Sequence, residues 1–378
     1  MPKIGAIEAT VSFGKLEYSL DDILGTLTHY RGWKYPSSYI IVELHNPHTE
    51  VLNEFMNYGK IEVRYGKDGD YSGPFKFEIA SVANEVEMSN AKVRLLAVEP
   101  GFVRLTEKNV IKSYPNQTVA GVMAEMAQKA GLNFGGVKKT SGSYTFVQPN
   151  ISDMMFLSKY LIPIGTDSSK TAPFLFTIDN NTMHFRPPDL KQDPKFQFIL
   201  DTSKDNVVKR FTVKNSGMET DLIYGTQYKT YGYDFTKKGQ ITHKDETKSV
   251  NQSFLSKKEY KSDFTRTRMM PYSEQWMLDA HNRNELGRAQ FIVTAEAVVT
   301  GENELDFDQI YQFTNLAFEQ EPSEYSGKYY VHDIVHTLKR RFFVTQLNLH
   351  TNSFLKAQKT PAPGPKQDGP RVKKAVNA

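Results

Sequence analysis

The alternation of apolar and polar residues along the first third of the chain predicts β-strands. Segments 61–65, 75–79 and 93–97 each place an apolar residue at every second position, with charged residues at most positions between. A period of two marks strands that are buried on one face. Residues 49–59 instead have a helical spacing, with a threonine at the start as a cap and a glycine at the end. We therefore expect residues 1–112 to form a β-barrel or sandwich that carries one helix.

A helical spacing is clearest in the next part of the chain. Between Asn116, a candidate cap, and Gly131, apolar residues recur at intervals of three and four. A second helix is predicted over 152–163, with a serine cap and a proline stop. Apolar segments on either side of the Asp-Asn-Asn turn at 179–181 predict a hairpin. Residues 113–200 are thus expected to be a small α/β domain.

Strand patterns then resume and continue through the rest of the chain. A Tyr-rich stretch leads into a polar, Lys-rich segment, 236–262, which we expect to be an exposed loop. A helix is predicted over 273–286. Four strands are predicted to follow it, at 289–300, 309–318, 328–336 and 342–350. We assign 236–356 to a second β-barrel domain, with 201–235 as a candidate for completing the first barrel, and we expect 357–378 to be a disordered basic, Pro-rich tail.

A short internal echo links the two predicted barrels. Ser72–Ile79 and Ser326–Ile334 both begin with Ser-Gly, and each opens a strand that leads through a turn into another alternating strand. If the echo reflects a duplication, the chain holds two similar β-barrel domains plus a small α/β domain. The predicted fold class is then mainly β with an α+β insertion.

The composition removes several classes of protein. The chain contains no cysteine, which excludes disulfides, zinc ribbons, thiolate nucleophiles and iron–sulfur ligation, and fits folding in a reducing cytoplasm. The sequence has no apolar run of the roughly 18 to 20 residues that a membrane-spanning helix needs. Glu8 stands where a signal peptide would have its apolar core. We expect a protein that is neither secreted by that route nor inserted in a membrane.

The net charge of +4 is carried by the tail. Residues 357–378 contain five basic residues against one acidic residue, Asp368, so the rest of the chain is balanced. Net charge therefore does not predict a large surface that neutralises phosphates.

Two groups of residues have spacings that suggest metal sites. His332 and His336 would share a metal on a helix, but their neighbours predict a strand, on which they lie about 13 Å apart. The segment 68–73 begins like a calcium loop, yet the twelfth position is Ile79 instead of a glutamate. We interpret the first pair as structural and the second segment as a hairpin turn.

The motifs of common enzymes are missing from the sequence. Neither a phosphate-binding GxxxxGK[ST] or GxGxxG loop nor a GxSxG elbow occurs. The alternating carboxylates Glu302, Glu304, Asp306 and Asp308 would need a dry pocket to act as an acid and base pair, and a solvated turn explains them better. We expect no enzyme activity, no catalytic residues, no cofactor and no metal.

A basic cluster beside aromatic residues offers a candidate interaction site. Lys339, Arg340 and Arg341 precede Phe342 and Phe343, a composition that can meet nucleic acid but more often forms the solvated turn of a hairpin. These five residues, together with Trp276, are our candidates for partner-interface anchors, although core burial explains each aromatic residue more simply.

The order of motifs along the chain resembles a known family. The motifs are Tyr144–Leu157, Thr182–Pro188, Ser326–His336 and Gln346–His350. In this order and spacing they resemble the central baseplate hub proteins of contractile-tailed, T-even-type bacteriophages, and the first part of type VI secretion spike proteins. The basic tail departs from that pattern, and we expect neither a lysozyme-like domain nor a long β-helical extension in this sequence.

The resemblance implies a structural protein of the virion. It implies a homotrimer in which each chain gives two tube-like barrels to a ring, so that six near-equivalent positions join a sixfold tail tube to a threefold spike. The implied partners are the tail tube protein and the trimeric spike protein, with tape-measure and baseplate wedge proteins as further candidates. DNA would only pass through the channel, and assembly would take place in the host cytoplasm.

Two other classes of function stay open from the residues alone. A β-rich adhesin or nucleic-acid-binding module would use Lys339–Arg341 and the tail, and would bind DNA in a salt-dependent way. A carbohydrate-active baseplate enzyme would use Glu304 and Asp306, with their carboxylates about 5–10 Å apart in a pocket.

Overall fold

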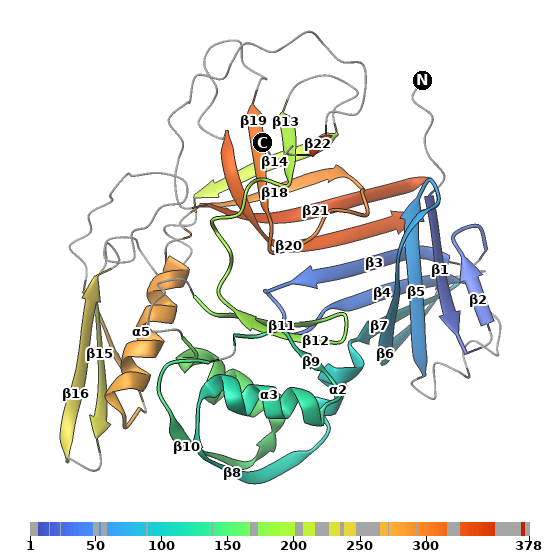
Figure 1. The fold of residues 1–378 in the computed structure, drawn as a ribbon. Helices are drawn as coiled ribbons and strands as arrows, with labels where there is room; N and C mark the ends of the chain where they lie inside the picture. The colour runs from blue at the N-terminus through green and yellow to red at the C-terminus, as the bar shows by residue number, and fades with distance from the viewer. Residues whose placement is uncertain are drawn as a thin grey trace.

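The computed structural model contains one large sheet, three smaller sheets and a few helices (Figure 1). The structure describes residues 7–14, 16–22, 24–47, 53, 59–87, 90–137, 139–166, 173–200, 207–215, 227–234, 238–246, 265–270, 272–289, 291, 293–315, 326–351 and 372–374. The mainly β fold class predicted from the sequence is confirmed.

The large sheet contains most of the strands of the described residues, and it falls into two lobes. The first lobe is built from β1 (Ile7–Phe13), β2 (Leu16–Ser19), β3 (Leu24–Gly32), β4 (Tyr39–His45), β5 (Lys60–Lys67), β6 (Asp70–Glu87) and β7 (Asn90–Val98). The second is built from β13 (Phe196–Leu200), β14 (Val208–Asn215), β18 (Val293–Thr300), β19 (Ile310–Asn315), β20 (Gly327–Lys339), β21 (Phe342–Thr351) and β22 (Val372–Lys374).

Each lobe encloses its own apolar core. In the first lobe, inward-facing residues such as Val11, Val42 and Leu95 are fully buried. In the second lobe, Tyr311, Val331 and Leu347 are fully buried in the same way. The inward side chains alternate with more exposed ones along the strands, because successive residues of a strand point to opposite faces.

The two lobes share one strand order. If β2 and β22 are set aside, each lobe has six strands in the large sheet. Numbered in chain order, their order across the sheet is first, fourth, fifth, sixth, third, second in both lobes. One pairing differs in direction, since β1 runs antiparallel to β5 whereas β13 runs parallel to β19.

Two irregularities of the first lobe recur in the second. β6 has a bulge at Ala80 against β7, and β20 has a bulge at His332 against β21. Each bulge lies the same number of residues before the end of its strand. β3 and β14 are both bulged near their starts, at Gly25 and Lys209. Shared order and shared bulges support the internal duplication that the Ser72 and Ser326 segments suggested, since these segments lie at the beginnings of equivalent strands, β6 and β20.

The lobes are joined into a continuous sheet by the pairing of β3 with β20. β20 is long enough to pair with two different strands along one edge. Its first residues pair with β19 and its last seven pair with β3, while β21 occupies the other edge. In Figure 1 this leaves the first lobe on the right continuous with the second lobe above it.

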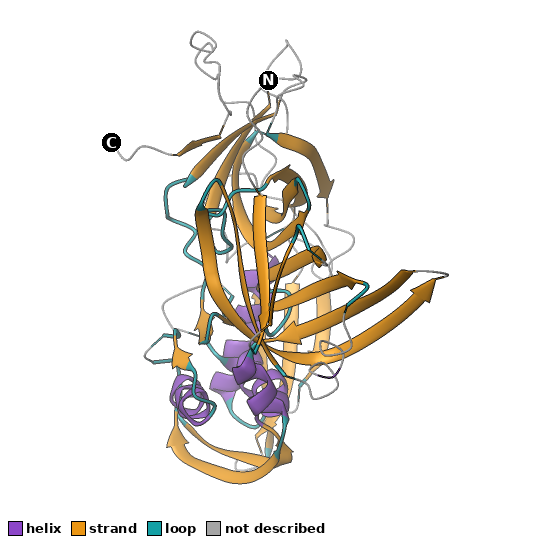
Figure 2. Cartoon of the chain, turned by 90° about the vertical axis from the view of Figure 1, so that its right-hand side faces the viewer, coloured by secondary structure: helices purple, strands orange, loops and turns teal. Residues whose placement is uncertain are grey.

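The small α/β domain lies at one end of the molecule, where most of the helices gather (Figure 2). Its helices are α2 (Pro100–Thr106), α3 (Val119–Lys129), α4 (Asp153–Phe156), the π-helical η1 (Leu157–Leu161) and the 3-10 helix η2 (Ile162–Ile164). Its strands are β8 (Asn109–Gln117), β9 (Asn133–Phe134), β10 (Tyr144–Ser152), β11 (Leu175–Asp179) and β12 (Thr182–Arg186). The predicted hairpin around 179–181 is confirmed.

The caps of this domain follow the expected chemistry with one correction. The side chain of Ser152 accepts a hydrogen bond from the backbone N–H of Met155 at 3.2 Å, as a helix cap should. Thr118, not Asn116, caps α3 and accepts from Gly121 at 3.1 Å. Asn116 has a φ of 48° within β8 instead.

A separate three-stranded sheet and a helix correct two predictions for the second half. β15 (Gln227–Asp234) pairs with β16 (Gly239–Glu246) and with β17 (Thr265–Met269), so part of the segment expected to be a loop is a strand. The predicted helix is α5 (Gln275–Ala289). It does not join the second lobe, because Met277 and Ala280 are buried in the core of the small domain.

Two further expectations about domain boundaries are corrected by strand pairing. Within 201–235, β14 pairs with β18 of the second lobe, so this segment does not complete the first barrel. β22, at 372–374, pairs with β13, so these tail residues are not free of structure. The predicted helix over 49–59, apart from Asn53 and Gly59, and the rest of the tail lie outside the described residues.

Candidate functional site

The joint between the lobes is the part of the molecule where both lobes and the small domain meet. β3 and β20 run antiparallel from Gly32 opposite Asp333 to Thr26 opposite Lys339. Gly32 has a φ of 153°, and a Cβ there would lie 2.7 Å from the Cα of Asp333. The close approach of the two backbones at this end therefore requires glycine.

A buried ion cluster ties the small domain to both lobes. Arg31 of β3 contacts Asp179 of the small domain at 2.7 Å and Asp306 of the second lobe at 3.0 Å. The hydroxyl of Ser38 also donates to Asp179, at 2.5 Å. Burial raises the pKa of Asp179, but the charge and hydrogen bonds of Arg31 outweigh it and hold that pKa at about 2. Asp179 is thus ionised and paired at neutral pH.

Asp333 organises the turn that follows β3. One of its oxygens, Oδ1, accepts from the Tyr30 hydroxyl at 2.6 Å and from the backbone N–H groups of Trp33 and Lys34 at 3.0 and 2.9 Å. The other oxygen lies 2.9 Å from Nδ1 of His332. Burial raises the pKa of Asp333, but these donors lower it to about 2. Nδ2 of Asn348 also donates to Oδ2, at 3.4 Å, so a carboxylate with five partners fixes the geometry of the joint from the second lobe.

His29 and His336 of the joint are buried side chains. Nδ1 of His29 lies 2.8 Å from the Tyr65 hydroxyl, and Nδ1 of His336 lies 2.9 Å from Oγ1 of Thr345. Burial and the nearby Arg31 lower the pKa of His336 to about 3, and burial lowers that of His29 well below its ordinary value. The strand that the sequence predicted for 328–336 is confirmed, and His336 is a packing residue in it.

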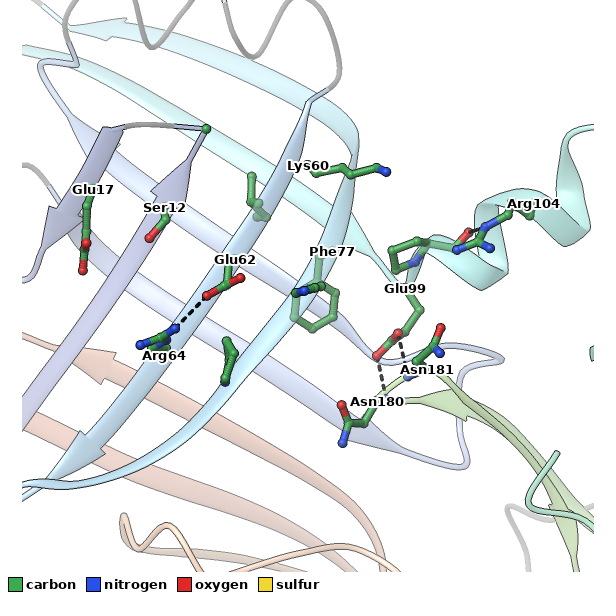
Figure 3. A pocket seen from close by; sticks show the side chains of 15 residues that line it. Ser12, Glu17, Lys60, Glu62, Arg64, Phe77, Glu99, Arg104, Asn180 and Asn181 are labelled. Carbon is green, nitrogen blue, oxygen red and sulfur yellow. Dashed lines mark hydrogen bonds and ion pairs between the residues drawn. The ribbon is translucent and has the colours of Figure 1, made fainter. Parts of the chain in front are cut away.

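Glu99 connects the first lobe to the hairpin turn of the small domain. Its carboxylate accepts from the backbone N–H groups of Asn180 and Asn181 at 2.7 and 3.2 Å (Figure 3). Burial, with the negative charge of Asp179, raises the pKa of Glu99 to about 7 despite these donors. This carboxyl therefore titrates near neutral pH.

A pocket of about 860 Å³ lies beside Glu99, between the first lobe and the Asn180–Asn181 turn (Figure 3). Its wall mixes charges of both signs, and β5 contributes Lys60, Glu62 and Arg64. Glu62 and Arg64 are paired with each other at 3.0 Å. Among the described residues, no group of three His, Asp or Glu side chains is placed to hold a metal ion.

The basic cluster singled out in the sequence forms the turn between β20 and β21. Arg341 adopts a φ of 64°, and Arg340 pairs with exposed Asp21 of the first lobe at 3.1 Å. Phe342 is 47% exposed at the start of β21, whereas Phe343 is buried in the core of the first lobe. The structure thus separates the two aromatics, since Phe342 is exposed and Phe343 is not.

Trp276 lies far along the chain from this cluster and packs inside the molecule. It contacts the core of the small domain from α5, and its ring faces Gly142, where a Cβ would lie 2.5 Å away. Asn284 of the same helix donates to the carbonyl of Gly165 at 2.8 Å and accepts from the backbone of Phe174 at 3.0 Å. The structure does not bring Trp276 together with the basic cluster.

The carboxylates at 302–308 lie in a loop, as expected, and Glu302, Asp306 and Asp308 form ion pairs, Glu302 with Lys67 at 3.5 Å. Asp306 pairs with Arg31, and Asp308 accepts from Arg186 and Tyr330, both at 2.7 Å. These contacts give Asp306 and Asp308 structural roles. The segment 68–73 covers the β5–β6 hairpin turn and the first residues of β6, so the hairpin interpretation is confirmed.

Comparison with known proteins gives matches among solved structures. No protein-family model and no curated protein matches the sequence. Among solved structures, a tail protein from Neisseria meningitidis matches with a TM-score of 0.66 at 10% identity, over 92% of this chain and 98% of that one. The 43 kDa tail protein of prophage MuSo2 from Shewanella oneidensis matches with a TM-score of 0.64 at 10% identity, over 92% and 99% of the chains.

This chain has the fold of a phage tail protein. A third match extends the likeness to secretion systems: the Escherichia coli c3393 protein, a type VI secretion component described as structurally similar to T4 tail proteins gp27 and gp5, gives a TM-score of 0.52 at 8% identity, over 93% of this chain and 79% of that one. The resemblance expected from the sequence is confirmed at the level of fold. Over the described residues, no helix is long and apolar enough to cross a membrane.

Sequence reasoning missed the joint altogether. Arg31 and Asp179 are separated by 148 residues, and neither belongs to a motif with a fixed spacing. The one signal that pointed toward the joint was the internal echo, because it marked β6 and β20 as equivalent strands. This equivalence does not by itself predict the joint, because the sequence does not show that β20 pairs with β3.

Proposed function

We propose that this protein is the structural hub of a phage tail baseplate. Three chains form a ring of six similar lobes, which joins a sixfold tail tube to a threefold central spike and leaves a channel for the genome. The observation that supports this proposal most directly is the duplication: two lobes with one strand order and shared bulges are joined edge to edge in a continuous sheet.

The physical argument is one of symmetry. A heterologous contact repeated between similar units gives a closed ring if the rotation closes. Two lobes per chain and three chains supply six similar surfaces on one face for the tube, while the small domains repeat only three times. The fold shared with phage tail proteins and with a type VI secretion component supports the same place in the assembly.

The proposed partners are the tail tube protein, the trimeric spike protein and, at the channel and rim, the tape-measure and wedge proteins. The proposed function is non-catalytic. The proposed location of the protein is the virion tail, after assembly in the host cytoplasm. Phe342 and the turn residues Lys339, Arg340 and Arg341 are the proposed contact residues on the exposed side of the joint.

The test is co-assembly with the tube and spike proteins of the same tail. We expect the chain to bind one end of preformed tubes and to capture the trimeric spike on its other face, as seen by electron microscopy of the mixtures. Tubes whose ends stay bare and a spike that remains unbound at micromolar concentrations of all three proteins would contradict the proposal.

A further inference from the structure

The floor of the pocket beside Glu99 is a row of residues that crosses four strands. Ser12 of β1 lies directly opposite Glu17 of β2 on one side and opposite Glu62 of β5 on the other. Glu62 lies opposite Lys76 of β6 in turn, and all four residues line the pocket. Neighbouring strands are about 4.8 Å apart, so the row is about 14 Å long. The pocket is therefore a groove across the strands that has room for about four extended residues before it reaches α2.

The two ends of this groove differ in charge. At the end beside α2 the lining includes three basic side chains, Lys60, Lys76 and Arg104. Among the described residues, none of these three side chains forms an ion pair. Figure 3 shows Lys60 extending toward the side of the pocket that α2 forms. At the β2 end the charged side chain is Glu17.

The carboxylate of Glu99 offsets the three cations only in part. It accepts from two backbone N–H groups of the hairpin turn, and burial with the negative charge of Asp179 raises its pKa to about 7. In the middle of the groove Glu62 and Arg64 are paired with each other at 3.0 Å and add no net charge. An anionic group of a ligand would therefore be stabilised at the α2 end. A nucleic acid, which is anionic along its whole length, would also meet the negative charge at the β2 end.

We infer that this groove binds an extended segment of a partner protein, with acidic side chains at the α2 end and a basic side chain beside Glu17. A pattern of charges that changes sign along the groove fixes how such a segment lies in it. The side chains of Ser12, Asn180 and Asn181 also line the groove, and they can bond the backbone of the segment as donors or acceptors. The site goes beyond the proposed ring, because it uses one lobe and the small domain of a single chain.

Glu99 should make this binding depend on pH. The charged groups around it are Asp179 of β11, Arg31 of β3, Arg104 of α2, Lys76 of β6, and Lys60 with the Glu62–Arg64 pair of β5. No histidine is among the described residues that line the pocket. A second carboxylate near Glu99 favours its protonated form, so binding is tighter at pH 6 than at pH 8. A further rise of one unit in the pKa of Glu99 corresponds to an affinity about fivefold lower at pH 8.

The test measures binding of labelled, end-blocked hexapeptides to the full chain by fluorescence anisotropy at low ionic strength. The probe is Glu-Glu-Thr-Thr-Thr-Lys, made in both chain directions, and the control peptides carry Gln in place of both Glu. We expect one acidic peptide to bind at least tenfold more tightly than its Gln counterpart at pH 6. Replacing its Lys by Gln should weaken binding about threefold to the wild type, as for an exposed ion pair, and should have no effect on binding to Glu17→Gln.

Variants of the protein test the residues of the groove. Lys60→Gln/Arg104→Gln removes two exposed cations and should lower the affinity for the acidic peptide at least tenfold. The matched control is Lys191→Gln, which removes an exposed lysine outside the pocket and should leave the affinity unchanged. In Glu99→Gln the affinity should no longer differ between pH 6 and pH 8.

Three results would overturn the inference. The first is equal binding of the Glu and Gln peptides, and the second is an equal effect of the pocket variant and the Lys191→Gln control. The third is complete displacement of the acidic peptide by an equimolar amount of inorganic pyrophosphate, which would show a general anion site. Each of these results leaves the proposed ring intact, because the ring is tested separately by the molar mass of the chain.

Discussion

Arg31 joins three parts of the molecule that are far apart in the chain. It belongs to β3, its guanidinium contacts Asp179 of the small domain at 2.7 Å, and it contacts Asp306 of the second lobe at 3.0 Å. The Arg31 side chain is 16% exposed and that of Asp179 is 5% exposed. Removing one member of a buried pair leaves the other charge uncompensated, which costs more than the pair itself contributes.

Substituting Arg31→Met should therefore lower the free energy of unfolding by about 3–5 kcal/mol, as measured by chemical denaturation. The matched control is Arg64→Met. The Arg64 side chain pairs with Glu62 and is 57% exposed. A pair in water is worth about 1 kcal/mol or less. Equal losses in the two variants would contradict the structural role of the cluster.

Glu99 makes the stability of the protein depend on pH. Its pKa in the folded protein is about 7, raised from an ordinary 4.5 by burial. The folded state therefore holds a proton between these values that the unfolded state has lost, so the contribution of Glu99 to stability falls as pH rises from about 4.5 to 7. It is greatest at low pH and is lost above 7.

Comparison with Glu99→Gln isolates this contribution from the other titrating groups. We expect the free energy of unfolding of the wild type, minus that of the variant, to fall by about 3 kcal/mol between pH 4.5 and 8. Denaturation curves at pH 4.5, 6, 7 and 8 measure the difference. A difference that is constant over this range would show that Glu99 titrates normally in the folded protein.

At the scale of elements, adjacent residues in one hairpin have separate roles. Phe342 is 47% exposed and Phe343 is 4% exposed, because successive side chains of β21 point to opposite faces. The sequence identified both as candidate anchors and could not separate them, since the face on which each lies depends on the register of β21 with β20 and β18.

Phe343→Ala should lower the free energy of unfolding by about 3–5 kcal/mol, because it empties a place in the core of the first lobe. Phe342→Ala should change it by less than about 0.5 kcal/mol, as is usual for an exposed site, while weakening binding to the tube or spike protein. Thermal unfolding and pull-down of both partners measure the two effects. The proposal for Phe342 fails if the variant binds both partners as the wild type does.

Elements with strong local patterns could be predicted from the sequence, whereas those defined by a distant partner could not. α3 and the β11–β12 hairpin were expected because periodicity and turn residues are local. β16 was expected to be a loop, because its residues 239–246 are polar and its strand conformation depends on pairing with β15. Likewise, the joint depends on β3 meeting β20 from the other half of the chain.

At the scale of the whole molecule, the duplication accounts for the arrangement of both lobes. One strand order, shared bulges and one type of joint describe a unit that is made twice and joined through the edges of β3 and β20. The tail proteins of Neisseria meningitidis and Shewanella oneidensis share this fold with only 10% identity.

The most direct test of the ring is the molar mass of the purified full chain in solution, measured by light scattering with and without the spike protein. The account predicts a trimer of three times 43.1 kDa, alone or induced by the spike. A strict monomer of 43.1 kDa that ignores the spike and the tube would contradict it.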